Sequence, residues 1–185
     1  NKVVIVADRG IGSSANLEAI KAHGFDYVIG ARLRAASKSV QEEAISPDGF
    51  IDFNNPDTDE VRRYKFIEQN KWVVLWSSKR AKKDKADRER LVEKAEEMLE
   101  SSSVSNKRGA KKYIASSKSS HSLAVDKIEE DKRFDGYYAL SFSDTTMSAQ
   151  EIVMAYSNLW RVEICQTYCL YKNKINVNLP FLPTN

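Results

Sequence analysis

The strongest constraint on the fold is an unbroken apolar run rich in β-branched residues, Val3–Ala7. Such a run, without polar alternation, is typical of a strand buried on both faces, in a parallel or mixed sheet flanked by helices. Ser13 or Ser14 can cap the helix that follows, and a second strand is expected at 25–31. Residues 1–34 therefore predict a β-α-β segment of an α/β fold.

The next hundred residues do not continue this alternation of strands and helices. Two expected strands, 62–68 and 72–76, are separated by a short polar turn and resemble a hairpin. A charged helix is expected over 82–100, where apolar residues form only a narrow stripe. The Ser-rich stretches 101–105 and 116–122 are predicted to be loops. The pattern indicates a mixed α+β region rather than further β-α units.

Regular order returns with an expected strand at 137–142 and a helix that begins with a capping box, Ser148 to Glu151. Trp160 and Glu163 follow Tyr156 by four and seven residues, so the carboxylate shares a stripe with large apolar side chains. A carboxylate on such a stripe needs a strong partner. The residues alone leave two partners open: an arginine, or a metal ion that Asp8 also binds.

Composition changes after Glu163. Residues 164–185 contain no Asp, Glu or Gly and hold both cysteines, which suggests an aberrant, frameshifted tail. The chain starts at Asn1, directly before a core-like strand, so we expect a fragment. It shows no signal peptide and no apolar run long enough for a membrane span, which predicts a cytoplasmic protein. The formal charge of +3 does not mark the whole chain as a nucleic-acid binder.

Two segments carry a resemblance to a known family. Asp8-Arg9-Gly10 after a strand is similar to the region around the second acidic residue of DDE transposases of bacterial insertion sequences. The segment 156–163, Tyr-Ser-Asn-Leu-Trp-Arg-Val-Glu, resembles the helix around their third acidic residue. The resemblance spans nearly everything from Val3 to Glu163. It implies a partial RNase H-like core, a mixed sheet with flanking helices, interrupted by an α+β insertion domain at 35–136, with core segments at 1–34 and 137–163.

The resemblance also implies the chemistry. Asp8 and Glu163 would be catalytic residues and ligands of Mg²⁺ or Mn²⁺, the ions that support phosphodiester hydrolysis and strand transfer. Tyr156, Trp160 and Arg161 would contact DNA, with transposon ends and target DNA as substrates. The full-length protein would be bacterial and nucleoid-associated, and it would be able to form a homodimer.

Three departures from the family pattern limit what this chain can do alone. In the family branch that the motif resembles, an arginine is expected at the position of Leu159 and a lysine at that of Leu170. Arg161 can take over part of the role of the arginine that is expected at position 159. Leu170 lies in the aberrant tail. The first acidic residue is expected upstream of Asn1. We therefore expect the chain to be inactive by itself.

Two other functions stay open. The segment 10–15, Gly-Ile-Gly-Ser-Ser-Ala, matches the dinucleotide fingerprint of an oxidoreductase-type domain, although the second strand ends in Arg32 rather than in an acidic residue for the ribose. We assign no cofactor-binding residues on this basis. A non-catalytic DNA-binding remnant is the other alternative.

Two basic clusters bear on DNA binding. The first lies at 79–90 and is diluted by acidic residues, so a solvated helix and a DNA contact explain it equally well. The second has no acidic residue among its members and is the better candidate for phosphate contact. Its members are Lys107, Arg108, Lys111 and Lys112.

Overall fold

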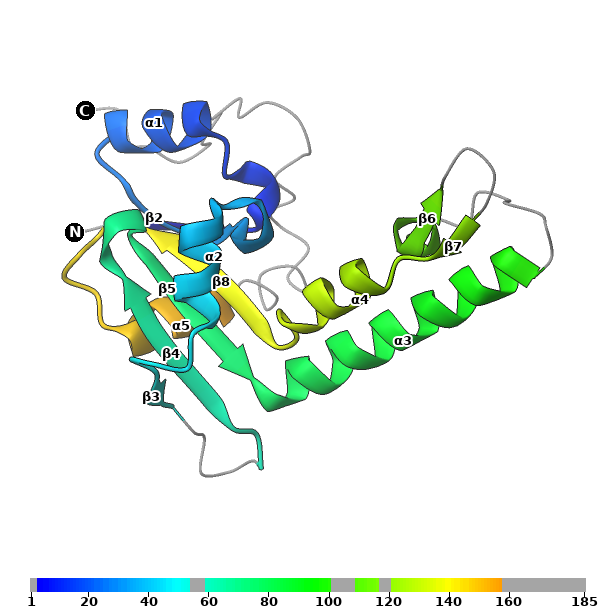
Figure 1. Ribbon diagram of the computed structural model, residues 1–185. Coiled ribbons are helices and arrows are strands. Elements are labelled where there is room, and N and C mark those ends of the chain that lie inside the picture. The colour runs from blue at the N-terminus through cyan, green and yellow to red at the C-terminus, as the bar shows by residue number, and fades with distance from the viewer. Residues whose placement is uncertain (1–2, 54–58, 101–108, 117–120, 158–185) are drawn as a thin grey trace, which may run out of the picture. The chain divides into compact units, whose positions relative to one another are not determined.

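The computed structural model describes residues 3–53, 59–100, 109–116 and 121–157 (Figure 1). The strands are β1 (Val4–Ala7), β2 (Asp26–Ala31), β3 (Ile51–Asp52), β4 (Arg62–Ile67), β5 (Trp72–Ser77), β6 (Ile114–Ser116), β7 (His121–Leu123) and β8 (Tyr137–Phe142). The α-helices are α1 (Ser14–Ala22), α2 (Lys38–Ile45), α3 (Ser78–Glu100), α4 (Val125–Lys132) and α5 (Ala149–Ser157). Short 3-10 turns are η1 (Arg9–Ile11), η2 (Leu33–Ala35), η3 (Glu68–Asn70) and η4 (Ala110–Tyr113).

Six strands share one mixed sheet in the order β1-β2-β8-β5-β4-β3, while β6 and β7 form a separate antiparallel pair. β1 and β2 are parallel, and β3 and β4 are antiparallel. The expected α/β class is therefore confirmed. The chain divides into two compact units: the first comprises Asn1–Arg32, Glu68–Val73 and Leu140–Asn185, and the second comprises Leu33–Ile67 and Val74–Ala139.

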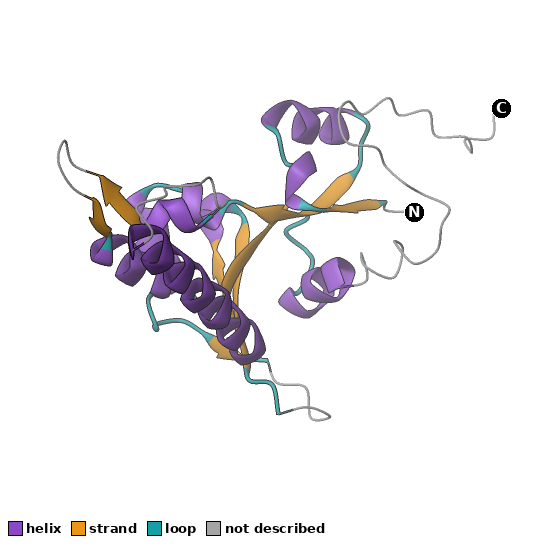
Figure 2. Ribbon diagram, turned by 90° about the vertical axis from the view of Figure 1, so that its right-hand side faces the viewer, coloured by secondary structure: helices purple, strands orange, loops and turns teal. Residues whose placement is uncertain are grey.

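The first unit contains the predicted β-α-β segment. Ser13 caps α1 by accepting a hydrogen bond from the backbone N–H of Asn16, and Gly24 follows the helix with a φ of +73°, a conformation that favours glycine. Ile20 of α1 packs on Tyr27 and Ile29 of β2. Because successive strand residues point to opposite faces, Val28 and Gly30 face the other side, where α5 packs on β1 and β2. Figure 2 shows helices on both sides of these strands.

β1 itself is less buried than its sequence predicts. Val4, Ile5 and Val6 are half-buried, and Ala7 is the first fully buried residue of the strand. The reason is position, because β1 lies at an edge of the described sheet. The strands with the most fully buried residues are β2, β8 and β5, in the interior of the strand order.

The second unit is built on the long helix α3, which α4 and the β6–β7 pair accompany (Figure 1). Ser77 caps α3 by accepting a hydrogen bond from the N–H of Arg80 at 3.1 Å. Ala95 and Met98 of the predicted apolar stripe are buried against Tyr113. The helix begins at Ser78, four residues before the position expected from the sequence.

Other expectations for this region were incomplete or wrong. The Ser-rich segment 116–122 is not wholly a loop, because its ends belong to β6 and β7, whose backbones pair in register. Helices α2 and α4 were not predicted, since each has only eight residues and a mostly charged or polar sequence. The strands β4 and β5 are neighbours in the sheet, as the hairpin pattern indicated. In the part of the chain that the structure describes, no helix combines the length and apolar character needed to cross a membrane.

Candidate active site at the ends of β1 and β2

Asp8 lies directly after β1, with its side chain exposed to solvent. Its Oδ1 accepts a hydrogen bond from the backbone N–H of Gly10 at 2.7 Å, which makes Asp8 the cap of the turn η1. The parallel register places Ala7 opposite Ile29, so the C-terminal ends of β1 and β2 lie at the same edge. Ligand sites of open α/β sheets form at such an edge.

Helix α5 is positioned on this pair of strands by its cap and by its apolar face. Ser148 Oγ accepts a hydrogen bond from the N–H of Glu151 at 3.3 Å, and Glu151 Oε2 accepts one from the N–H of Ser148 at 2.8 Å. The predicted capping box is thereby confirmed. The hydrogen bond from the backbone N–H of Ser148, followed by that from its hydroxyl, lowers the pKa of Glu151. Ile152 and Val153 are buried.

The C-terminal end of α5 reaches the strand ends next to Asp8. Tyr156 lies so close to β2 that a Cβ added to Gly30 would be 2.9 Å from its hydroxyl oxygen. The same Cβ would lie 3.3 Å from Cβ of Arg9, the residue that follows Asp8. The sequence analysis did not single out this use of Gly30. A glycine inside a strand is nevertheless a known sign that another part of the chain approaches closely.

Gly30→Ala should therefore lower the free energy of unfolding by about 1–3 kcal/mol, because the added methyl group overpacks the space below Tyr156. In a Tyr156→Phe background the hydroxyl oxygen nearest to the added methyl group is absent. Gly30→Ala should then lower the free energy of unfolding by roughly 1 kcal/mol less. Urea unfolding of the four proteins measures this coupling. Equal costs in both backgrounds would show that the hydroxyl does not occupy this space.

The remaining residues predicted for this site lie outside the described part of the chain. These are Trp160, Arg161 and Glu163. Within the described residues, no group of three His, Cys, Asp or Glu side chains is arranged to hold a metal ion. The structure thus brings together Asp8, Arg9, Gly30 and Tyr156 in the first unit. The positions of Asp8 and Glu163 relative to each other stay a prediction.

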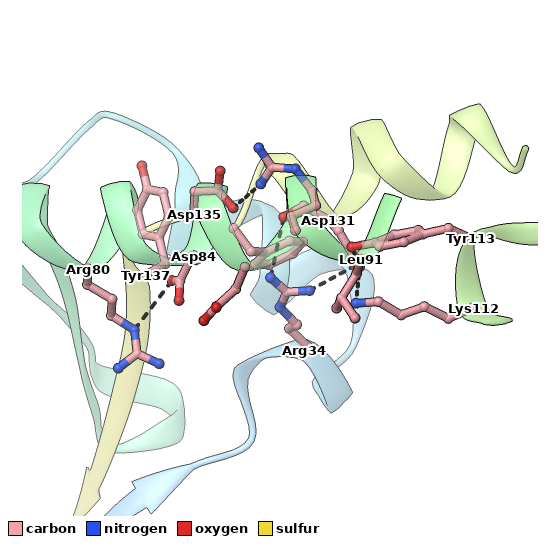
Figure 3. Close-up of a pocket in the computed structure, with 12 residues that line it drawn as sticks. Arg34, Arg80, Asp84, Leu91, Lys112, Tyr113, Asp131, Asp135 and Tyr137 are labelled. Carbon is pink, nitrogen blue, oxygen red and sulfur yellow. Dashed lines mark hydrogen bonds and ion pairs between the residues drawn. The ribbon is translucent and has the colours of Figure 1, made fainter. Parts of the chain in front are cut away.

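A second polar cluster, in the second unit, surrounds Asp131 (Figure 3). Asp131 Oδ2 accepts hydrogen bonds from Lys112 Nζ at 2.8 Å and from the Tyr113 hydroxyl at 2.9 Å. Arg34 Nη1 lies 2.8 Å from Oδ1. Burial by itself would raise the pKa of Asp131, but these hydrogen bonds and the charges of Lys112 and Arg34 outweigh it, so the pKa is lowered.

This arrangement corrects one expectation about the second basic cluster. The sequence indicated that no acidic residue neutralises it, yet Lys112 is paired with the buried carboxylate of Asp131. The partner was missed because it lies on α4, nineteen residues further along the chain. Lys111 is exposed, and Lys107 and Arg108 lie outside the described residues. The prediction that this cluster binds DNA is untested.

The cluster borders a cavity of about 170 Å³. Its other carboxylates also have partners inside the protein: Asp135 pairs with the buried Arg88, and Asp84 pairs with Arg80 and accepts the N–H of Gly136. Figure 3 shows Arg34 and Lys112 directed at Asp131, and Arg80 beside Asp84. The ion pairs therefore account for the charges around this cavity as structural interactions.

The dinucleotide alternative gains no support from the turn after β1. The strand, turn and helix are arranged as that fingerprint requires. However, the N–H of Gly10, a donor that a pyrophosphate would need, is already engaged by Asp8. β2 is followed by Arg32, so the acidic residue expected to bind the ribose is missing.

Comparison with known proteins gives an independent result. A family model described as the transposase DDE domain matches residues 1–166, a range that includes both Asp8 and Glu163. No curated protein and no solved structure matches the chain. Because the family model covers most of the 185 residues, the assignment does not depend on the two short motifs alone. The chain belongs to the transposase DDE domain family.

Proposed function

We propose that this chain carries part of the catalytic centre of a DNA transposase, with Asp8 and Glu163 as metal-binding carboxylates. The observation that carries the proposal is the meeting of the Asp8 turn with the end of α5. Tyr156, the first residue of the segment that leads to Glu163, lies over Gly30 beside Arg9. The family match over residues 1–166 supports the same assignment.

The proposed architecture is an RNase H-like core interrupted by an insertion domain at 35–136. The division of the chain supports it, because β1, β2 and α5 belong to the first unit although more than a hundred residues separate β2 from α5. The intervening helices α2, α3 and α4 belong to the second unit. Apart from Glu68–Val73, which belongs to the first unit, this is the arrangement expected when a second structural unit is inserted into a loop of the first.

The residues at the proposed centre fit Mg²⁺ or Mn²⁺ in part. Asp8 offers a hard oxygen ligand that is exposed, and among the described residues only its Oδ1 accepts a hydrogen bond. Bound divalent ions would activate the attacking oxygen and stabilise the leaving oxygen of a phosphodiester. The role of the protein is to hold the carboxylates in place, and the η1 turn does this for Asp8.

DNA is the substrate that the family implies. We propose insertion-sequence ends and target DNA in particular, with Tyr156, Trp160 and Arg161 as contact residues near the reacting phosphate. Tyr156 is half-buried, so part of its surface stays accessible while its hydroxyl lies over Gly30. A homodimer of the full-length protein belongs to the same proposal.

Binding of Mn²⁺ to the isotopically labelled chain tests the centre directly. Paramagnetic broadening of amide NMR signals should be strongest around Asp8 and Gly10, because the ion would bind within a few ångströms of that turn. Asp8→Asn should abolish this broadening, and Glu163→Gln should weaken it. Asp59→Asn changes an exposed carboxylate in the second unit and serves as the matched control. Broadening that persists in the Asp8→Asn protein would contradict the assignment.

A further inference from the structure

Helix α3 carries three lysines on the side that faces away from its core contacts. Arg88, Ala95 and Met98 mark the buried side of the helix. At 100° per residue, the opposite side is occupied by a second stripe that starts near the N-terminal end. Its exposed lysines, named here the α3 lysine patch, are Lys79, Lys82 and Lys83. Ala86, exposed one turn further on, leaves room for a large partner to approach.

The ion pairs of α3 do not neutralise the α3 lysine patch. Three of the other basic residues of the helix have carboxylate partners on the same helix: the pairs are Arg80–Asp84, Lys85–Glu89 and Arg90–Asp87. Within the described residues, the three lysines of the patch have no carboxylate oxygen within 4.0 Å. Lys79 is near enough to Glu60 to help lower the pKa of that carboxyl, but all three lysines are exposed to the solvent, separated by no more than about 6 Å along the helix axis.

The order of charges along α3 does not serve the stability of the helix. The first turn holds no acidic residue and the last turn no basic one. Acidic residues instead gather toward the C-terminal end, where Glu93, Glu96, Glu97 and Glu100 are exposed. The helix dipole favours the opposite order, with acidic side chains first and basic side chains last. A function in binding explains why lysines occupy the unfavourable end.

We propose that the α3 lysine patch binds the phosphate backbone of duplex DNA. The inference rests on the proposed function for its choice of partner, since a transposase acts on DNA. It concerns a different surface, because the patch belongs to the second unit and Asp8 to the first. Lysine ammonium groups contact phosphates as point charges and carry little sequence information. The patch therefore holds DNA of any sequence and leaves recognition of element ends to other residues.

Fluorescence anisotropy of the 185-residue chain with a random-sequence DNA duplex, at a series of salt concentrations, tests the patch. The triple variant Lys79→Gln/Lys82→Gln/Lys83→Gln removes three phosphate contacts, so the slope of log affinity against log salt should flatten by about 2.7, at roughly 0.9 per contact. Glu93→Lys/Glu97→Lys extends the basic stripe along the same side of α3. This second variant should make the slope steeper.

The control triple is Lys38→Gln/Lys127→Gln/Lys132→Gln. It removes the same charge from exposed lysines of the second unit whose ammonium groups already pair with Glu130 or Glu129. Its slope should match that of the unchanged protein. If both triple variants flatten the slope equally, the effect comes from net charge and the proposal that the patch binds DNA is wrong. A DNA affinity that does not depend on salt would contradict the proposal as well. Failure of the proposed catalytic function would show separately, in the Mn²⁺ experiment with Asp8→Asn.

Discussion

Asp135→Ala should lower the free energy of unfolding by about 3–5 kcal/mol, the range typical of a buried ion pair that loses one partner. Asp135 pairs with Arg88, whose side chain is only 9 % exposed. Without the carboxylate, the guanidinium would be left charged in a largely buried site without its ion-pair partner. Urea or guanidinium unfolding followed by circular dichroism measures the change.

The double variant Arg88→Met/Asp135→Ala separates this cause from a general loss of packing. It removes both charges and keeps an apolar side chain of similar length at position 88, so it should cost less than Asp135→Ala alone. Asp87→Ala is the matched control, because Asp87 forms an exposed pair with Arg90 and such pairs contribute at most about 1 kcal/mol. A double variant less stable than Asp135→Ala would contradict this cause, because Arg88 would then stabilise the unit through packing and not suffer from an unpaired charge.

In a DNA-cleaving protein that contains this chain, Asp8→Asn should lower metal-dependent cleavage and strand joining by about 100-fold or more. The change removes the negative charge at nearly constant shape, and small misplacements at a reacting centre can cost about that factor. Glu163→Gln should have a similar effect. Single-turnover cleavage of an element-end duplex with Mg²⁺ or Mn²⁺ gives the rates.

Two measurements keep this result interpretable. DNA affinity and unfolding should be nearly unchanged in Asp8→Asn, because the side chain is exposed and an asparagine oxygen can still accept the N–H of Gly10. Asp59→Asn should cleave at the normal rate, since this exposed residue lies in the other unit. Normal cleavage by Asp8→Asn would mean that the family motif was aligned to the wrong residue.

The first unit was predictable because its signals are local. The apolar runs of β1 and β2, the Ser13 cap and the Ser148–Glu151 box each act within one element or between residues three apart. The motif after β1 also placed Asp8 at a strand end, as the structure has it. These features depend on backbone geometry that a short segment establishes by itself.

The second unit was harder to predict because its elements depend on contacts between residues far apart in the sequence. Its short helices α2 and α4 are mostly polar, and their ion pairs join residues far apart in the sequence, as Lys38–Glu130 and Arg133–Glu42 do. The serines at the ends of 116–122 belong to strands because β6 and β7 pair with each other. Sequence patterns within one element carry no information on such partners.

The sequence by itself determined the α/β class, the first β-α-β segment, the cap of α5 and the family, because each depends on residue types at fixed local spacing. Only the tertiary structure decided that Gly30 receives the hydroxyl of Tyr156, and that Lys112 is bound to Asp131 instead of being free for phosphate. Both contacts join separate elements, and the packing that creates them is a property of the folded chain rather than of any one segment.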